Sequence, residues 1–444
     1  MDTLTLQPER ERGGHISVAA LFVVLAAGKP RASTRHLLRG IDRAVIGRGR
    51  EHVSRRESDR MSLELPDPHL SLQHASVQRD VGRWVLRDLG SKNGVKVNGE
   101  RVTERALESG DWIELGETFL RFRVLKLAAS EADDVSGADR LSVVPAVEQA
   151  FGRLIESAAS NVSVLLLGES GAGKEVAARM LHERSARPGA FVAVNCAGLV
   201  DTLAAATLFG HRRGAYTGAI DDRPGAIRAS HGGTLLLDEV GDLPPATQGV
   251  LLRVLQEREV VPIGDTVPVA VDVRFVAATL RDLSRDVEAG RFRVDLYARL
   301  AGLRVTLPPL RERLEDLGTL VASFLARHAP GRELGLSAAA AWAMCRHRWP
   351  LNIRELDQAI AAAAAVARED RIGLDHLPDH IRDLAVAARP PGTRRDELLG
   401  LLRDYRGNLA AVARALGTSR AQVHRLLRRF QLDPHEYRQK AAGE

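Results

Sequence analysis

A glycine-rich segment that ends in a lysine is the part of this chain best equipped for chemistry. An apolar run typical of a buried strand, Val162–Leu167, precedes it, and a helix pattern follows Lys174. Glycines let the chain wrap closely around phosphates, so that backbone N–H groups, the helix N-terminus and the Lys174 ammonium all face them. The spacing therefore predicts a site for ATP with magnesium, made by Gly168, Glu169, Ser170, Gly171, Ala172, Gly173, Lys174 and Glu175.

An acidic pair supplies the second half of this chemistry. Glu175 stands where most phosphate loops carry Ser or Thr to contact the metal, so the ion must depend on water and on a carboxylate elsewhere. A second buried-strand pattern, Gly233–Leu237, ends in Asp238 and Glu239. Adjacent acids suit two tasks, with Asp238 binding hydrated Mg²⁺ and Glu239 polarising the attacking water. They predict ATP hydrolysis, and a solvated acidic turn is the alternative interpretation.

The whole chain bounds the context of this site. A chain of 444 residues is too long to fold around one hydrophobic core, so its length predicts about three domains. Cys196 and Cys345 are the only cysteines, which implies no disulfide framework and fits a reducing, cytoplasmic location. The apolar run Ile16–Ala27 is too short to span a bilayer and is interpreted as a strand, so no membrane association is expected.

The excess of basic over acidic residues lies at one end of the chain. Arg389–Glu444 holds twelve Arg or Lys and six Asp or Glu residues, which accounts for the whole net charge of +6. This asymmetry is typical of a nucleic-acid-binding module attached to a neutral protein. Polar or breaker-rich stretches at 127–139 and 385–395 are predicted to be linkers.

Residues 17–126 alternate short β-rich runs with turns, which predicts an all-β sandwich. Their motifs, in order, are Ile46–Arg48, Leu70–Ala75, Trp84–Gly94, Val97–Gly99 and Gly110–Gly116. This series resembles the forkhead-associated (FHA) domain. The resemblance implies phosphothreonine recognition by Arg48, Ser71 and Asn93, with His74 as a scaffold residue. Leu72 replaces a residue that is commonly polar in the family, so weaker phosphopeptide binding is expected.

Residues 140–384 resemble the AAA+ domain of sigma-54-dependent transcriptional activators, an α/β P-loop ATPase with a helical lid. The resemblance rests on the phosphate loop and acidic pair together with Phe191–Ala197, Leu208–Ala219, Phe292–Leu300, Leu307–Arg313 and Trp349–Leu356. The decisive element is the family's GAFTGA loop, which contacts sigma-54. It corresponds here to Gly214, Ala215, Tyr216, Thr217, Gly218 and Ala219.

The same resemblance assigns further roles. Asn195 would couple the state of Glu239 to the sigma-54 loop, and Arg354 would sense nucleotide from the lid. Arg293 and Arg299 would be arginine fingers that reach the γ-phosphate in a neighbouring subunit. A guanidinium supplied on assembly suits the charge that develops on a transferring phosphoryl group, which implies a homo-oligomeric ring, expected to be a hexamer.

Several residues depart from the family pattern. Leu280 stands where the family has a polar Asn that senses the γ-phosphate, and a hydrocarbon side chain cannot form a hydrogen bond to phosphate or water. Slow hydrolysis is therefore expected. The other departures are Tyr216 for Phe, Leu351 for Gly, Ala298 for Tyr, and Ala204–Ala206 in place of acidic residues.

Residues 396–444 read as an all-α helix-turn-helix. An amphipathic helix, a second helix after Asn408 and a basic helix capped by Ser419 resemble the Fis-type DNA-binding domain. Val423, Leu426 and Leu427 have the spacing of core residues. The residues expected to contact DNA are Ser419, Arg420, Gln422, His424 and Arg425 at bases, and Arg428 and Arg429 at phosphates.

Together these patterns predict a multidomain protein that binds enhancer DNA, reads a phosphothreonine from a partner protein or Ser/Thr kinase, and remodels sigma-54 RNA polymerase holoenzyme with ATP. Two alternatives stay open. One is a DNA-bound repressor or scaffold with an impaired ATPase, favoured by Leu280. The other is an activator of a different sigma-factor holoenzyme, for which Tyr216 gives faint support.

Overall fold

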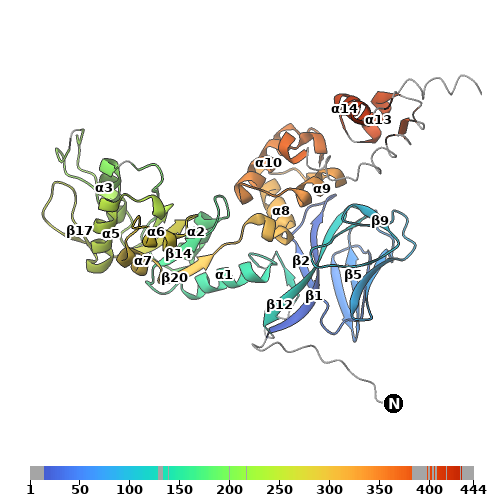
Figure 1. Cartoon of the computed structure of the whole chain (residues 1–444), viewed down its shortest axis with the longest axis horizontal. Helices are drawn as coiled ribbons and strands as arrows, with labels where there is room; N and C mark the ends of the chain where they lie inside the picture. Colours follow the sequence, from blue (N-terminus) through green and yellow to red (C-terminus); the bar gives the residue numbers. More distant parts are fainter. Residues whose placement is uncertain are drawn as a thin grey trace, which may run out of the picture. The chain divides into compact units, whose positions relative to one another are not determined.

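The computed structural model describes residues 15–128, 134–138, 140–199, 201–216 and 218–382, and in the C-terminal region residues 398, 401–402, 405, 408–416, 418–430 and 432. The chain divides into two compact units (Figure 1). The first comprises residues 1–144, 313–349 and 356–444, and the second comprises 145–312 and 350–355. No helix in the described part of the chain has the length and apolar character needed to cross a membrane.

The N-terminal part of the first unit is a sandwich of two sheets, as the sequence predicts. Its strand orders are β13-β2-β1-β12-β11-β8-β9 and β10-β7-β6-β3-β5-β4. The strands are β1 His15–Ala26, β2 Thr34–Leu37, β3 Arg43–Arg48, β4 Val53–Glu57, β5 Arg60–Leu65, β6 Ala75–Asp80, β7 Arg83–Asp88, β8 Val95–Val97, β9 Glu100–Val102, β10 Glu104–Ala106, β11 Trp112–Leu115, β12 Thr118–Ala128 and β13 Val135–Ser136.

The apolar run Ile16–Ala27 is a strand, since β1 covers nearly all of it and pairs with β2 and β12. Part of the segment predicted to be a linker, residues 127–139, forms strands, because β12 extends to Ala128 and β13 extends the first sheet beside β2. Asp134 anchors it by accepting hydrogen bonds from Leu37 N–H at 2.8 Å and from the Arg56 guanidinium at 2.7 Å.

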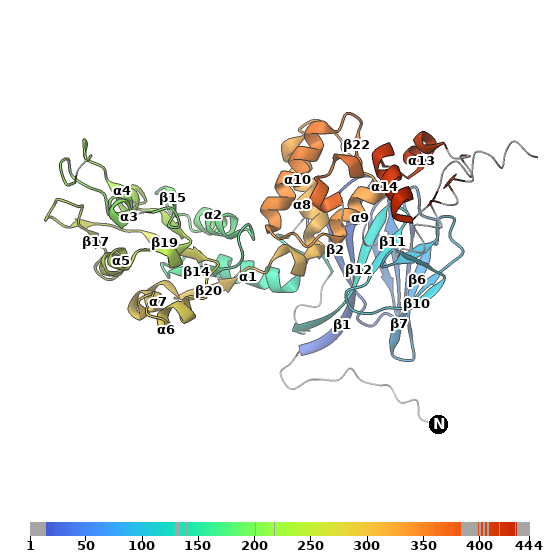
Figure 2. The ribbon, with the colours of Figure 1, turned by 45° about the horizontal axis from the view of Figure 1, so that its top comes forward.

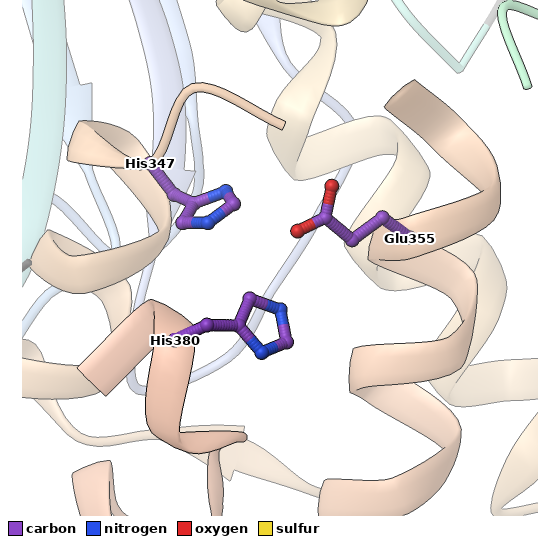
Figure 3. A group of neighbouring side chains, drawn as sticks. All are labelled: His347, Glu355 and His380. Atoms are coloured by element: carbon purple, nitrogen blue, oxygen red, sulfur yellow. The ribbon is translucent and has the colours of Figure 1, made fainter. Parts of the chain in front are cut away.

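The first unit also contains the helical segment that follows Glu312. Its elements are η4 Leu314–Asp316, α8 Leu317–His328, β21 Gly335–Leu336, α9 Ala338–Arg346, most of α10 Asn352–Val366, β22 Arg371–Ile372 and η5 Leu374–His376. The His347 ring packs edge to face on His380, with ring centroids 5.6 Å apart (Figure 3). Nδ1 of His347 accepts the Trp349 N–H at 2.9 Å, which orders the turn after α9.

The second unit is a five-stranded parallel sheet covered by helices on both faces (Figure 2). Alternate residues of β14 point to opposite faces, so that Val164 and Leu166 pack with α1 and α2, and Leu165 packs with the cluster that includes α3, α4 and α5. The strand order is β15-β16-β19-β14-β20. The elements are α1 Pro145–Glu156, β14 Val164–Leu167, α2 Lys174–Arg184, β15 Phe191–Asn195, α3 Asp201–Phe209, α4 Gly225–Ala229, β16 Thr234–Asp238, η2 Val240–Asp242, α5 Pro245–Glu257, β17 Glu259–Val260, β18 Val269–Ala270, β19 Arg274–Thr279, α6 Leu283–Glu288, α7 Val294–Leu300, β20 Leu303–Thr306 and η3 Leu310–Glu312.

Two C-terminal helices, α13 Leu409–Ala415 and α14 Arg420–Phe430, share a small apolar core. Val423, Leu426 and Leu427 are buried in it, as their spacing predicts. Side chains cap both helices, because Asn408 Oδ1 accepts the Ala410 N–H and Ser419 Oγ accepts the Gln422 N–H. Most of the preceding segment, in which the sequence predicts another helix, lies outside the described residues.

Candidate nucleotide site

The P-loop, residues 168–175, joins the carboxyl end of β14 to the start of α2. Gly171 and Gly173 have φ values of 72° and 101°, a region that glycine enters without a steric penalty. A side chain at Gly171 is also excluded by space, since its Cβ would lie 2.3 Å from the Leu351 carbonyl oxygen. The glycine spacing read in the sequence thus meets real conformational requirements.

Lys174 lies at the centre of the loop and is only 6% exposed. Its Nζ donates to the carbonyl oxygens of Gly168 at 2.8 Å and Glu169 at 3.3 Å. Glu175 points outward and pairs with Arg179 one turn along α2, so its carboxylate is directed away from the Lys174 ammonium. A buried ammonium held by main-chain carbonyls is well placed to exchange these weak partners for phosphate oxygens.

The predicted acidic pair lies beside this lysine. The carboxyl ends of β14 and β16 meet at the same edge of the parallel sheet, and Glu239 Oε1 lies 3.4 Å from Lys174 Nζ. Burial raises the pKa of Asp238, and the neighbouring Glu239 charge raises it further. A divalent cation at the pair would relieve both effects, so the residues present fit a magnesium ion.

Glu239 is held in a defined orientation. Its backbone has a φ of 51°, which is uncommon for a residue with a side chain. Oε2 accepts the main-chain N–H of Leu280 at 3.1 Å, whereas the Leu280 side chain is 58% exposed. The residue that departs from the family pattern therefore orients the glutamate through its backbone while its side chain offers no polar group.

Two residues that were not predicted from the sequence form hydrogen bonds to the P-loop. Asn352, fully buried, donates from Nδ2 to the Ser170 carbonyl at 2.9 Å and accepts the Leu310 N–H at 2.8 Å. Arg311 binds both carboxylate oxygens of Glu169, at 2.6 and 2.7 Å, which lowers the pKa of Glu169 to about 2 with a smaller contribution from Asn352. Arg311 lies in the motif Leu307–Arg313 and Asn352 in the motif Trp349–Leu356. Their place in these motifs was the only feature of the sequence that pointed to them.

The structure brings some of the other predicted residues to the site and leaves some apart. Arg354 reaches it, since its guanidinium donates to Ser170 Oγ at 3.0 Å. Asn195 lies beside Asp238 in the β15–β16 register, but its side chain accepts the Ala197 N–H, and no Asn195–Glu239 hydrogen bond occurs among the described residues.

Arg293 and Arg299 lie at the two ends of α7 and are exposed. Arg293 pairs with Asp295 at 2.7 Å. Within the part of the chain that the structure describes, neither arginine bonds to the P-loop or to the acidic pair.

The segment that corresponds to the sigma-54 contact loop projects from the unit between α3 and α4. Gly214 N–H donates to the Ala219 carbonyl at 2.8 Å, which closes the base of the loop, and Tyr216 packs edge to face on His211. Arg212 anchors the base through ion pairs with Asp222 and Asp265. Gly214 and Gly218 are exposed, and Thr217 lies outside the described residues.

The predicted phosphothreonine residues come together at the end of β3, which holds Arg48, and on two loops of the sandwich, which hold Ser71 and Asn93. Arg48 N–H donates to the Ser71 carbonyl at 2.9 Å, Ser71 Oγ accepts the Lys92 N–H at 3.1 Å, and Asn93 donates to the His69 carbonyl at 2.7 Å. His74 is fully buried and joins two of the loops, because Nδ1 accepts the Ser71 N–H and Nε2 lies 3.1 Å from the Gly94 carbonyl oxygen. Leu72 is 74% exposed beside them.

The predicted DNA-contact residues divide by exposure. Ser419, Arg420, His424 and Arg425 are exposed on α14. Gln422 is only 8% exposed, and its Oε1 accepts a hydrogen bond from Arg425 at 3.3 Å, so it positions Arg425 instead of presenting its own amide. Arg428 and Arg429 belong to α14, but their side chains are not described.

Comparisons with known proteins agree with this geometry. Family models match the Sigma-54 interaction domain over residues 142–306, the FHA domain over 44–116 and the AAA+ ATPase lid domain over 311–393. Response regulator protein FleR of Pseudomonas aeruginosa is 47% identical over 226 residues, which are 49% of this chain and 48% of that protein. The DNA-binding transcriptional regulator NtrC of Azospirillum brasilense is 41% identical over 271 residues, 59% of this chain and 56% of that protein.

The chain thus spans about half the length of the curated relatives it matches. Among solved structures, NtrX from Brucella abortus in complex with ATP is 30% identical, with a TM-score of 0.51, over 66% of this chain and 69% of that chain. The same protein in complex with ADP gives the same values. The chain therefore carries a sigma-54 interaction domain together with an AAA+ ATPase lid domain and an FHA domain.

Proposed function

We propose that the chain is a sigma-54-dependent transcriptional regulator that uses ATP hydrolysis to open promoters. One observation carries this proposal: Lys174 lies against the acidic pair in the same domain that carries the Gly214–Ala219 loop, with Gly214 and Gly218 exposed, and that matches the Sigma-54 interaction domain. ATP hydrolysis at the Lys174 site would drive the Gly214–Ala219 loop against sigma-54 RNA polymerase holoenzyme.

The residues of the site have separate tasks in this proposal. The P-loop N–H groups and Lys174 hold the β- and γ-phosphates, and Asp238 holds Mg²⁺. ATP with Mg²⁺, when bound, supplies the phosphoanhydride bond. Glu239, fixed by the Leu280 N–H, orients a water molecule and withdraws its proton toward the carboxylate. Arg354 contacts the loop from the same subunit, and Arg293 and Arg299 stabilise the developing charge in the next subunit of a hexameric ring.

Open-complex formation on a sigma-54 promoter that carries the protein's own binding site tests this function. Lys174→Ala and Thr217→Ala are both expected to abolish opening, the first with loss of ATP binding and the second with ATP hydrolysis retained. Opening that survives either substitution would contradict the proposal. Opening that requires ATP but not sigma-54 would favour action on a different holoenzyme.

The exposed, apolar Leu280 side chain favours the second candidate, a DNA-bound repressor or scaffold with an impaired ATPase. Single-turnover hydrolysis distinguishes the two. ATP binding without measurable hydrolysis, together with repression of a reporter, would support the scaffold.

We infer that the FHA domain recognises phosphothreonine. The grouping of Arg48 at the end of β3 with Ser71 and Asn93 on two neighbouring loops supports this, because a guanidinium, a hydroxyl and loop N–H groups suit a phosphate dianion. Binding of phosphothreonine peptides is expected to be lost in Arg48→Ala and kept in Arg79→Ala, which removes another exposed arginine of the same sheet. Equal binding by both variants would refute this assignment.

We also propose that α13 and α14 act as a Fis-type helix-turn-helix on enhancer DNA. The exposed Arg420, His424 and Arg425 support this proposal. Replacing Arg425 with Ala is expected to reduce specific DNA binding by roughly tenfold or more, whereas Arg414→Ala on α13 serves as the matched control. An unchanged affinity in Arg425→Ala would exclude α14 as the recognition helix.

A further inference from the structure

The first strand of the FHA domain is buried on both faces. Strand side chains alternate, and Ala19, Leu21 and Val23 of β1 pack into the sandwich core. Ala20, Phe22 and Val24 therefore point away from that core, to the side that faces water in an isolated sandwich. Each of these three is nevertheless at most 1% exposed. Another part of the chain must cover this outer face.

The part that covers this face is the lid, which comprises residues 313–349 and 356–382 of the same unit. Helix α8 and η4 pack on β1, and α9 packs on β12 (Figure 2). The approach is close, because a Cβ on Gly318 of α8 would lie 2.0 Å from the Val24 carbonyl oxygen. Leu336 of the lid donates its N–H to the Ala27 carbonyl at 2.7 Å, which extends main-chain bonding from the end of β1 into the lid.

Side chains complete this interface with polar contacts on its inside. Ser33 N–H donates to Thr319 Oγ1 at 2.9 Å, and Thr319 N–H donates to Ser33 Oγ at 3.3 Å. The Glu315 carboxylate of the lid, 2% exposed, lies 3.1 Å from Arg123 and 3.5 Å from Arg121 of β12. Such a buried carboxylate is stable only while its guanidinium partners stay in place, so separating the two surfaces would be costly.

Aromatic packing adds to the same interface. Phe119 of β12 is fully buried and stacks on Trp342 of α9, with ring centroids 6.0 Å apart. At the rim, Lys29 pairs with Glu333 at 2.9 Å, and Arg371 pairs with Glu117. Apolar, charged and main-chain contacts thus cover one continuous outer sheet face, unlike the sparse contacts of a tethered domain.

We propose that the FHA domain and the lid form one rigid body, with the outer face of β1 and β12 as a permanent docking surface for the lid. Helix α10 begins with Asn352 and Arg354, which bond to the P-loop in the second unit, and its residues from Leu356 onward belong to the lid. The direction of signalling rests on the proposed function: a phosphothreonine ligand would act on the nucleotide site through the lid, not through the linker at 127–139.

Pulsed electron paramagnetic resonance on the full chain tests the rigid body. Nitroxide labels at Arg79→Cys in β6 and Val366→Cys in α10 report the FHA–lid distance, and the native Cys196 and Cys345 are buried. One narrow distance distribution, identical with ADP and with a non-hydrolysable ATP analogue, is expected. A broad or nucleotide-dependent distribution would overturn the proposal, whereas a Glu57→Cys and Arg79→Cys pair checks the FHA domain alone.

Two variants test the interface itself. Gly318→Val should broaden the FHA–lid distribution and leave the intra-FHA pair unchanged, while Gly152→Val in α1, where a Cβ meets nothing within 4 Å, should leave both unchanged. Glu315→Arg should also broaden it, and Glu315→Arg combined with Arg123→Glu should restore most of the narrow component. A narrow distribution in both Gly318→Val and Glu315→Arg would refute the assigned interface. Because no sigma-54 or phosphopeptide is present, failure here is separable from failure of the proposed function.

Discussion

Leu280 illustrates how a single residue can keep a structural task and lose a chemical one. Its N–H holds Glu239 in place, a task that any residue type except proline can perform, while its exposed side chain carries no group that could form a hydrogen bond to phosphate or water. In the proposed function Glu239 is therefore expected to be correctly oriented, and any slowing of hydrolysis should come from weaker stabilisation of the transition state. This separates nucleotide binding, which should be normal, from turnover, which should be slow.

Restoring a polar side chain at this position should raise turnover. Leu280→Asn is expected to increase the kcat of ATP hydrolysis by about tenfold or more, because a positioned amide donor strengthens its bond as charge develops. The KM for ATP should change little, since the binding residues are untouched. Steady-state hydrolysis by Leu280→Asn and Leu280→Ala distinguishes a polar effect from the removal of a bulky side chain. Equal rates in both variants would show that position 280 does not limit turnover.

At the scale of elements, local patterns predicted local structure well. The P-loop, the acidic pair and the β1 strand each follow from a run of neighbouring residues, and each lies where its pattern indicates. Asn352 and Arg311 could not be found this way, because they reach the P-loop only after a segment more than 100 residues away folds beside it. The apolar residues on both faces of β1 gave a visible signal of a second packing surface, but not of the lid that supplies it.

A histidine pair between two strands of the FHA domain makes stability depend on pH. His36 Nε2 on β2 lies 3.2 Å from His52 Nε2, just before β4, and Thr34 Oγ1 lies within 3.3 Å of both. Burial lowers the pKa of His52 to about 4, with further lowering by the charges of His36 and Arg31. The unfolded chain, with a pKa of about 6.5, therefore binds a proton more readily than the folded protein.

Stability contributed by neutral His52 should be complete above pH 6.5 and decline as the pH falls toward 4. The expected loss at pH 5 is up to about 2 kcal/mol. Thermal unfolding of the wild type and of His52→Gln between pH 8 and 4.5 measures it, since the variant should lose this component and keep the titration of the carboxylates. Parallel profiles for the two proteins would contradict the assignment to His52.

At the scale of the whole molecule, the two candidate arginine fingers determine whether a single subunit can hydrolyse ATP or whether an assembly is required. Arg293 and Arg299 make no bond to the P-loop or acidic pair among the described residues of their own chain, although both lie in the second unit with that site. A guanidinium that acts on a transferring phosphoryl group must approach it closely. In the proposed function these arginines act in a neighbouring subunit, so each active site would be shared between two subunits.

Mixing inactive variants tests this shared site. Lys174→Ala should lack nucleotide binding and Arg299→Ala should lack the finger, so each alone is expected to be inactive. In a mixed ring, an Arg299→Ala subunit followed by a Lys174→Ala subunit reconstitutes one complete site, and random assembly gives about a quarter of such pairings. Recovery of hydrolysis toward that fraction on mixing would establish action between subunits. A mixture of Lys174→Ala with the Lys174→Ala, Arg299→Ala double variant should stay inactive, because it contains no intact P-loop. If the first mixture stays equally inactive while light scattering shows mixed rings, Arg299 does not complete a neighbouring subunit's nucleotide site.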